Sequence, residues 1–132
     1  MRVYLDSAPI IYLVENVSPH IDYLLSRLAN ENALQICSDL SRLECRVFPV
    51  REQKTTLSAA FDAYFNTIIN EIVPLTSTVI DLGTEIRAQY GFKTPDALHL
   101  ACAVSANCDL FMTNDKQLER FQEIAVEVIT AG

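Results

Sequence analysis

The first fifteen residues of the chain, MRVYLDSAPIIYLVE (residues 1–15), decide the fold class. Residues 2–5 are typical of a short buried strand, and Asp6 follows them directly. Ser7 is a suitable N-cap and Pro9 fits a first helical turn, so the apolar stripe that comes next predicts a helix. A strand that passes at once into a helix indicates an α/β protein.

The rest of the chain continues this alternation. Further strands are predicted over residues 33–37, 110–113 and 125–129. Further helices are predicted from 18 to about 30–32, from a cap at Asp39 or Ser41 to a break or kink near Pro49, and over 57–72, 76–90, 95–107 and 115–121. Strands separated by helices form a parallel sheet that is covered on both faces. We therefore expect a three-layer α/β/α fold with a central, mainly parallel sheet of about four to five strands.

Length and composition limit the possible classes of protein. The chain has 132 residues, of which 50% are hydrophobic, with 3 Gly and 5 Pro. This predicts one domain over residues 1–132 and excludes disordered, collagen-like and linker-dominated chains. The net charge of −7 has the wrong sign for holding nucleic acid by bulk electrostatics alone. A polyanionic partner would therefore need a local cation to bind here.

The sequence also predicts a compartment. The longest apolar stretch, residues 8–14, is far shorter than the roughly 18 residues of a membrane span, so no membrane association is expected. Asp6 lies where a secretory signal would have its apolar centre. We expect a cytoplasmic protein whose four cysteines are reduced thiols, because they form no C-x-x-C pair. These cysteines are Cys37, Cys45, Cys102 and Cys108.

Four acidic residues lie where an α/β sheet places its ligand site, beyond the carboxyl ends of the strands. Asp6 and Asp115 follow predicted strands, whereas Glu44 and Asp96 lie in the first turns of predicted helices. Clustered carboxylates repel one another unless they are protonated or bind a hard cation. The pattern therefore indicates a site for Mg²⁺ or Mn²⁺ that would suit hydrolysis of a phosphodiester.

Each acid also has a structural interpretation. Asp96 would complement a helix dipole, and Asp115 would cap the short helix that follows it. Glu44 stands three residues after Ser41 and would complete an S-x-x-E capping box. Asp6 is the exception, because the next residue already supplies a cap and an acid that ends a buried strand needs a partner.

Other polar residues lie close to these acids in the sequence. His99 follows Asp96 by three residues and shares its helix face, where it would either approach the site or pack in the core. Five basic residues flank the acids and would either contact an RNA backbone or remain solvated. They are Arg42, Arg46, Arg87, Lys93 and Lys116.

Four segments carry a family resemblance. They are LDSAPIIYLVE (5–15), LSRLECRV (40–47), IRAQYGFKTPDALHLACA (86–103) and FMTNDKQLERF (111–121). Together, in this order, they resemble PIN-domain proteins of the VapC toxin family, and the resemblance covers nearly the whole chain. The PDALHLA segment and the opening LDS are its most specific parts.

This resemblance implies a metal-dependent endoribonuclease, the toxin of a type II toxin–antitoxin pair. The acidic positions of the family fall on Asp6, Glu44, Asp96 and Asp115, and its neighbouring polar positions fall on Ser7, Thr113 and Asn114. The implied cofactor is Mg²⁺ or Mn²⁺. The implied partners are an RNA substrate, a cognate VapB-like antitoxin and a second copy of the chain in a helix-mediated homodimer.

Some alternatives remain open at this level. An additional acid, Asp39, lies near Glu44 and competes with it for a place in the site. The chain could be a catalytically weak PIN-like dimeric binding module, or a PIN nuclease of RNA processing outside a toxin–antitoxin pair. A haloacid-dehalogenase phosphatase is disfavoured, because that chemistry needs a second acid at the position of Ala8.

Overall fold

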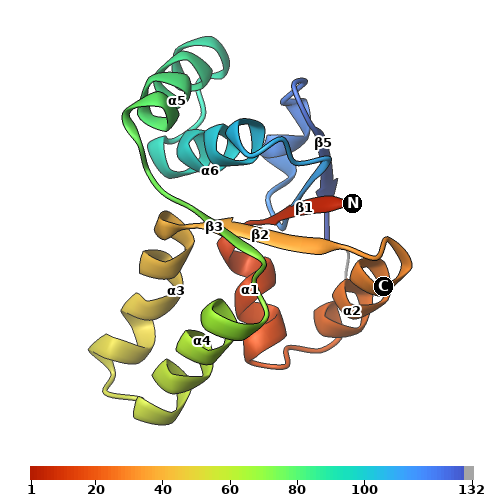
Figure 1. The fold of residues 1–132 in the computed structure, drawn as a ribbon, viewed down its shortest axis with the longest axis vertical. Helices are drawn as coiled ribbons and strands as arrows, with labels where there is room; N and C mark the ends of the chain where they lie inside the picture. Colours follow the sequence, from red (N-terminus) through yellow and green to blue (C-terminus); the bar gives the residue numbers. More distant parts are fainter. Residues whose placement is uncertain (130–132) are drawn as a thin grey trace.

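The computed structural model of the protein describes residues 1–129. Its strands are β1 (Arg2–Leu5), β2 (Leu34–Ser38), β3 (Glu71–Val73), β4 (Leu110–Thr113) and β5 (Ala125–Val128). Its helices are α1 (Ser7–Val14), α2 (His20–Asn30), α3 (Asp39–Arg51), α4 (Thr55–Thr67), α5 (Ser77–Tyr90), α6 (Thr94–Ser105) and the short 3₁₀ helix η1 (Lys116–Arg120). Helices lie on both sides of the central sheet (Figure 1). Within the described residues, no helix has the length and apolar character that a membrane span requires.

All five strands are parallel, in the order β3-β2-β1-β4-β5. Strand β1 is central, and Tyr4 lies opposite Ile36 of β2 and Phe111 of β4. After β1 the chain builds outward through β2 and β3, and then crosses to the other side of β1 to form β4. This reversal is a topological switch point, where α/β sheets open a crevice beyond the carboxyl ends of the strands. The residues that follow β1 and β4 therefore meet at that crevice.

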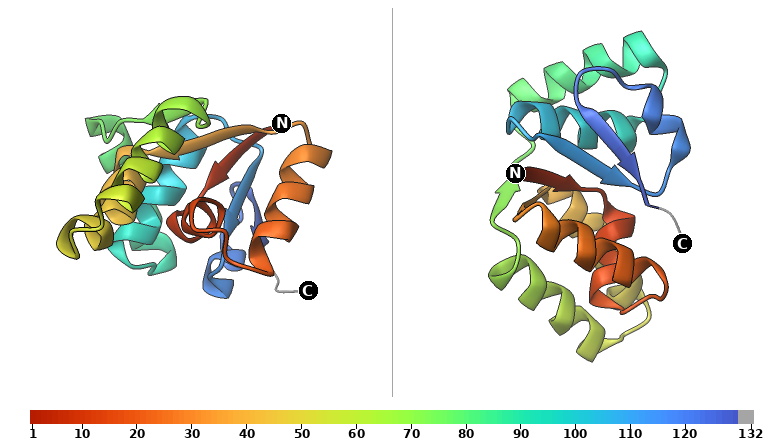
Figure 2. Two further views of the ribbon diagram at one scale, coloured as in Figure 1. Left: turned by 90° about the horizontal axis from the view of Figure 1, so that it is seen from below. Right: turned by 90° about the vertical axis from the view of Figure 1, so that its right-hand side faces the viewer.

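The alternation of side chains along β1 divides the core into two layers. Val3 and Leu5 pack with α1 to α4 on one face of the sheet. Tyr4, between them in the sequence, points to the opposite face and packs with α5, α6 and η1. Figure 2 shows these two helical layers from two further directions. The three-layer α/β/α fold expected from the sequence is confirmed.

One predicted helix is wrong at its end. The apolar spacing predicts a helix over 57–72, but α4 ends at Thr67 and residues 71–73 form the edge strand β3. The isoleucines at 68, 69 and 72 preserve the helical spacing, so periodicity alone hides the strand. Pairing decides instead, because the Asn70 backbone N–H donates to the Gln35 carbonyl and starts the ladder with β2.

The predicted helix caps also need correction. Asp6, rather than Ser7, is the N-cap of α1. Ser38 caps α3, rather than Asp39 or Ser41, and Ser38 and Ser41 form a reciprocal capping box. The strand β2 delivers Ser38 in an extended conformation, which an N-cap requires. Helix α3 also continues through Pro49 to residue 51, close enough to its end that little helix follows the proline.

A charged network ties α2 to the edge strand β5 and makes stability depend on pH. Arg27 donates to both carboxylate oxygens of Glu127, and the Tyr23 hydroxyl donates to one of them. The hydrogen bonds from Arg27 are the main reason that the pKa of Glu127 is below its ordinary value of 4.5. A lowered folded-state pKa means that Glu127 stabilises the fold above that ordinary value and loses this effect as the pH falls.

We therefore expect Glu127→Gln to lower the free energy of unfolding at neutral pH by about 1 kcal/mol, since the network is partly exposed. The difference from the wild type should shrink in urea unfolding at about pH 3. Glu123→Gln is the control, because Glu123 is an exposed glutamate four residues before Glu127. This variant should leave the free energy of unfolding unchanged. A difference for Glu127→Gln that is equal at both pH values would contradict this interpretation.

Candidate metal centre at the carboxyl edge of the sheet

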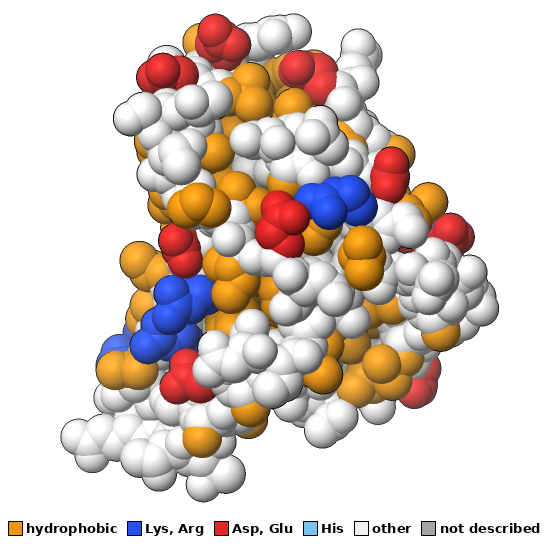
Figure 3. Space-filling view, in the orientation of Figure 1, with side chains coloured by type: hydrophobic (Ala, Val, Ile, Leu, Met, Phe, Trp, Pro, Cys, Tyr) orange, Lys and Arg blue, Asp and Glu red, His pale blue; other side chains and the backbone are white. Residues whose placement is uncertain are grey.

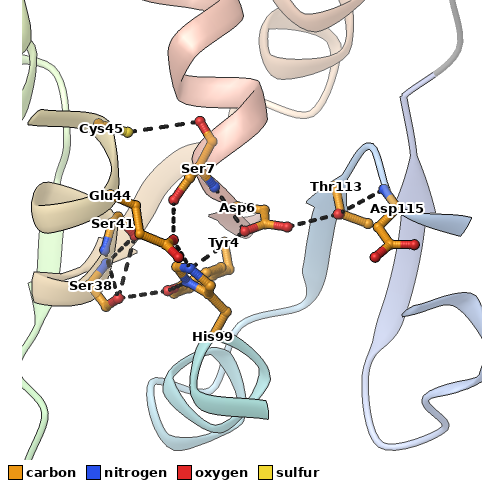
Figure 4. A network of polar contacts seen from close by, with 10 residues as sticks. All are labelled: Tyr4, Asp6, Ser7, Ser38, Ser41, Glu44, Cys45, His99, Thr113 and Asp115. Carbon is orange, nitrogen blue, oxygen red and sulfur yellow. Dashed lines mark hydrogen bonds and ion pairs between the residues drawn. The ribbon is translucent and has the colours of Figure 1, made fainter. Parts of the chain in front are cut away.

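Asp6 lies at the switch point, directly after β1, and both of its carboxylate oxygens are held. Its Oδ1 accepts from the Ser7 backbone N–H at 2.8 Å, as the cap of α1, and its Oδ2 accepts from the Thr113 hydroxyl at 2.8 Å. Its side chain is 14% exposed. Contacts with the start of α1 and the end of β4 thus fix this carboxylate in one orientation at the switch point of the sheet (Figure 4).

Glu44 reaches the same place from α3. Its Oε1 accepts from the Ser7 hydroxyl at 2.7 Å and from His99 Nε2 at 2.6 Å. Partial burial would raise the pKa of Glu44, but the hydrogen bonds from His99 and Ser7 lower it more, so the carboxylate is ionised at neutral pH. Its other oxygen, Oε2, accepts no hydrogen bond from residues 1–129. That oxygen is available to a ligand.

His99 is 2% exposed and stands between the two acids. Its Nε2 is 3.6 Å from Asp6 Oδ1, and its Nδ1 is 2.7 Å from the Tyr4 hydroxyl. Burial lowers the pKa of His99, but the hydrogen bond to Glu44 and the nearby negative charges raise it above its ordinary value. Ligand atoms of Asp6, Glu44 and His99 all lie within 4.8 Å of one another.

Asp96 and Asp115 are the other two acids that the sequence predicts for the site. Asp96 lies in the first turn of α6, one turn before His99. Burial raises the pKa of Asp96, and the negative charges of Asp6, Asp115 and Glu44 raise it further. Asp115 caps η1 by accepting from the Gln117 backbone N–H, and its own N–H donates to the Thr113 hydroxyl. The charges of the other three acids thus act on Asp96, whereas the group of ligand atoms that lie within 4.8 Å of one another consists, among the described residues, of Asp6, Glu44 and His99.

The structural interpretations of these acids have mixed outcomes. The capping box proposed for Ser41 and Glu44 is wrong, because Ser41 pairs with Ser38 and leaves Glu44 free for the site. Asp115 is a cap, as the alternative expected. Asp6 is also a cap, which the sequence assigned to its neighbour, so Asp6 serves both the helix and the site.

Some of the other sequence-selected residues join this group and others do not. Ser7 and Thr113 hydrogen-bond directly to the acids, whereas the Asn114 side chain donates to the Tyr12 hydroxyl at 3.1 Å. Asp39 is exposed and pairs with Arg42 at 3.3 Å, so the acid that α3 contributes is Glu44. Asp39 and Arg42 form an ion pair on the surface of α3.

The basic residues differ in how they are engaged. Lys and Arg side chains gather over α3 in Figure 3. Arg87, at the end of α5, donates to the carbonyl of Phe92. Lys93 directly precedes α6 and Lys116 opens η1, and both are exposed without an ion pair among residues 1–129. His99 is too buried to contact RNA directly.

Sequence reasoning missed two residues of the network, Tyr4 and Ser38. The Tyr4 hydroxyl donates to Ser38 Oγ at 2.9 Å and also contacts His99. A tyrosine in a fully buried central strand must find a polar partner for its hydroxyl, and that requirement was the available signal. The identity of the partner depends on how α6 packs against the sheet.

The residues present fit a hard divalent cation. Their donors are carboxylate oxygens, the ligands that Mg²⁺ and Mn²⁺ prefer. Burial is the main reason that the pKa of Asp96 is raised, and the neighbouring negative charges raise it further, a repulsion that a cation would relieve. The unpaired Oε2 of Glu44 provides a free ligand atom, so the group has both the charge and the chemistry of a metal site.

Solved structures share this fold at low sequence identity. VapBC2 of Rickettsia felis, solved bound to a DNA fragment from its promoter, has a TM-score of 0.79 at 17% identity, covering 98% of this chain and 100% of that chain. A toxin–antitoxin complex from Klebsiella pneumoniae has a TM-score of 0.74 at 17% identity, covering 93% and 95%. VapC20 of Mycobacterium tuberculosis, a sarcin–ricin loop cleaving toxin, has a TM-score of 0.69 at 14% identity, covering 93% and 98%.

The family of the protein follows from a comparison of its sequence with family models. No curated protein matches the chain. The family model of the PIN domain does match, over residues 3–124, a range that contains all four acids and the whole hydrogen-bond network around them. The chain therefore belongs to the PIN domain family.

Proposed function

We propose that the protein is a metal-dependent endoribonuclease that hydrolyses RNA phosphodiester bonds and acts as the toxin of a type II toxin–antitoxin pair. The observation that carries this proposal is that Asp6 and Glu44 are held beside His99 at the switch point of the sheet, with Glu44 Oε2 accepting no hydrogen bond from the described residues. Membership of the PIN domain family and the fold shared with toxins support the same function.

In this proposal Asp6, Glu44, Asp96 and Asp115 hold Mg²⁺ or Mn²⁺. When bound, the metal supplies a water of lowered pKa and neutralises charge on the phosphodiester. The protein's own contribution is preorganisation: Ser7 and Thr113 hold the acids in place before any ion arrives. Asn114 has a more remote role, as support for the loop between β4 and η1.

RNA would reach the acids past Lys93 and Lys116. Each lysine is adjacent to the segment that carries one of the acids, and each is free of ion pairs among the described residues. A net charge of −7 disfavours an RNA backbone elsewhere on the protein, so local cations must guide it. Arg42 and Arg87 are already engaged by protein groups and would contribute less, to RNA or to an antitoxin.

The toxin part of the proposal rests on the likeness to toxin–antitoxin complexes. It places the protein in the cytoplasm with a VapB-like antitoxin encoded nearby. We expect expression of the chain alone to inhibit growth and co-expression of that small neighbour to relieve the inhibition. An unaffected host, with an active nuclease in vitro, would favour a PIN nuclease of RNA processing instead.

A homodimer is proposed from the surface of α3. Leu43, Val47 and Val50 are 59%, 47% and 62% exposed and recur at helical spacing, so α3 presents an apolar face to solvent. We expect Val47→Glu to weaken dimerisation at least about tenfold, because a buried unpaired charge costs well over about 1.4 kcal/mol. Light scattering across a dilution series measures this, with the exposed Leu25→Glu on α2 as the control. A dimer that survives Val47→Glu would place the interface elsewhere.

The experiment for the catalytic proposal is cleavage of a mixed pool of structured RNA by the purified chain. Cleavage should require Mg²⁺ or Mn²⁺, stop with EDTA and return when metal is added in excess. Asp39→Asn should cleave like the wild type, because Asp39 lies on the surface in an ion pair with Arg42. Metal binding without turnover on any RNA would favour the binding module, and cleavage that persists in EDTA would contradict the proposal.

A further inference from the structure

The orientation of Glu44 depends on its neighbours, because its side chain is longer and more exposed than that of Asp6. Asp6 is short, caps a helix and is held at both oxygens. Glu44 has a longer side chain that is 30% exposed, and both of its hydrogen bonds fall on Oε1. A freely rotating glutamate would spend much of its time away from the site and would lose entropy on binding a metal. The groups that hold Oε1 therefore decide how often Oε2 is available.

His99 is a rigid support for that oxygen. Its ring is 2% exposed and meets the Tyr4 ring edge-on, with centroids 5.8 Å apart. Tyr4 is fully buried in β1, stacks on Phe111 at 5.2 Å and donates its hydroxyl to Ser38. A continuous chain of contacts thus runs from the central strand through Tyr4 and His99 to Glu44. Figure 4 shows His99 projecting from α6 toward Tyr4 and Glu44.

The geometry also decides which role the imidazole has. An ionised carboxylate only accepts hydrogen bonds, so at 2.6 Å from Glu44 Oε1 the Nε2 of His99 must carry the hydrogen. A nitrogen that carries a hydrogen has no lone pair to give to a metal. His99 therefore acts on the metal through Glu44, as second-layer donors do in other metal sites.

We propose that Tyr4 and His99 form a buried clamp that positions Glu44, by holding Oε1 and leaving Oε2 free to bind the metal. His99 is a positioning residue in this account, and Tyr4 fixes its ring. The inference rests on the proposed function, because it assumes that the acids bind a divalent ion. It gives His99 a defined role and adds Tyr4, which the acidic pattern does not identify.

The test compares two amide variants of His99 by their affinity for Mn²⁺. In His99→Gln, the amide nitrogen can reach the place of Nε2 and donate to Glu44. In His99→Asn, the shorter amide occupies the place of Nδ1 and reaches only Tyr4. We expect Mn²⁺ affinity of the full, metal-free chain to fall about 10- to 100-fold in His99→Asn and to recover largely in His99→Gln. The signal of free Mn²⁺ in electron paramagnetic resonance provides the measurement.

A second background separates positioning from general damage. Glu44→Gln should lower Mn²⁺ affinity by itself, and adding His99→Asn to it should cost little more, because the clamp then has no carboxylate to hold. If His99→Asn does not fold, Tyr4→Phe provides the same test. It removes a single hydroxyl that supports the His99 ring. It should lower Mn²⁺ affinity by a smaller factor than His99→Asn does, and only when Glu44 is intact.

The outcomes distinguish failure of this inference from failure of the proposed function. No Mn²⁺ binding by the wild type would overturn both. Binding that is equal in the wild type and in His99→Asn would overturn the clamp and leave the metal site intact. Equal losses in His99→Asn with and without the Glu44 carboxylate would also overturn it, as would a directly coordinated nitrogen from His99 in the spin-echo spectrum of bound Mn²⁺.

Discussion

Asp6→Asn is expected to lower metal-dependent RNA cleavage by about a thousandfold or more, because a metal contributes several kcal/mol and each 1.4 kcal/mol is a factor of ten. The substitution removes one negative charge and keeps the shape of the side chain. The fold should tolerate it, because asparagine is an equally good N-cap and its oxygen can still accept from the Ser7 N–H. Its amide nitrogen can donate to the Thr113 hydroxyl, which accepts where it previously donated.

Single-turnover cleavage of one RNA substrate, with thermal unfolding of the same samples, measures both parts of this prediction. Asp39→Asn makes the same chemical change at an exposed carboxylate and should leave both quantities unaltered. Activity of Asp6→Asn within a few-fold of the wild type, at the same Mg²⁺ dependence, would show that Asp6 is only a helix cap. An unfolded variant would show that its structural role dominates.

Asp96→Asn is expected to lower cleavage about as much as Asp6→Asn does. Unlike Asp6→Asn, it is expected to raise the stability of the metal-free protein. Burial and the charges of Asp6 and Asp115 raise the pKa of Asp96 in the folded state. A raised folded-state pKa means that the protonated acid favours the fold and that this effect is lost as the pH rises through that pKa. At neutral pH the ionised Asp96 therefore opposes folding, and a neutral amide relieves the repulsion.

Three conditions test the sign of this effect by thermal unfolding. In EDTA at neutral pH, Asp96→Asn should unfold at a higher temperature than the wild type. Well below the ordinary aspartate pKa of 3.8 the two should converge, because the wild-type acid is then protonated in both states. Saturating Mg²⁺ should stabilise the wild type more than the variant, since only ligands that bind the folded state add stability. A variant that is less stable in EDTA would assign Asp96 to the helix dipole instead.

The expected loss of cleavage and the expected gain in stability of Asp96→Asn have a common cause. The acids are brought together at the end of β1 by packing on both faces of the sheet, and the unfolded chain does not feel their repulsion. A cluster of like charges that lowers the stability of the fold is typical of a ligand-binding site. The hydrogen bonds to Asp6 and Glu44 offset part of this repulsion. At Asp96, burial and then the charges of Asp6 and Asp115 raise the pKa, and His99 offsets only part of the rise.

The sequence predicted much of this arrangement because the features are local. The strand–Asp6–helix start, the helix stop at Gly91 and the early position of Asp96 in α6 each follow from a few adjacent residues. Parallel strands then bring the residues that follow them to one edge, so the contact of Asp6 with the end of β4 could be expected from element order alone.

What the sequence did not show depends on contacts between distant segments. The edge strand β3 has three residues and exists through its pairing with β2, so helical spacing through Ile72 concealed it. Ser38 caps α3 because β2 ends there and delivers it in an extended conformation, and Ser41 then completes the capping box. The contact of Tyr4 with His99 joins positions 95 residues apart, and only the packing of α6 on the sheet creates it.

The most direct test of the metal centre is a crystal of the wild-type protein soaked in Mn²⁺, with anomalous scattering measured at the manganese edge. The account predicts a peak in ligand contact with Asp6 and Glu44 Oε2, close to Asp96 and Asp115, and no such peak in a matched crystal of Asp6→Asn. A well-ordered crystal with no peak at these carboxylates, or with Mn²⁺ bound only elsewhere, would contradict the account.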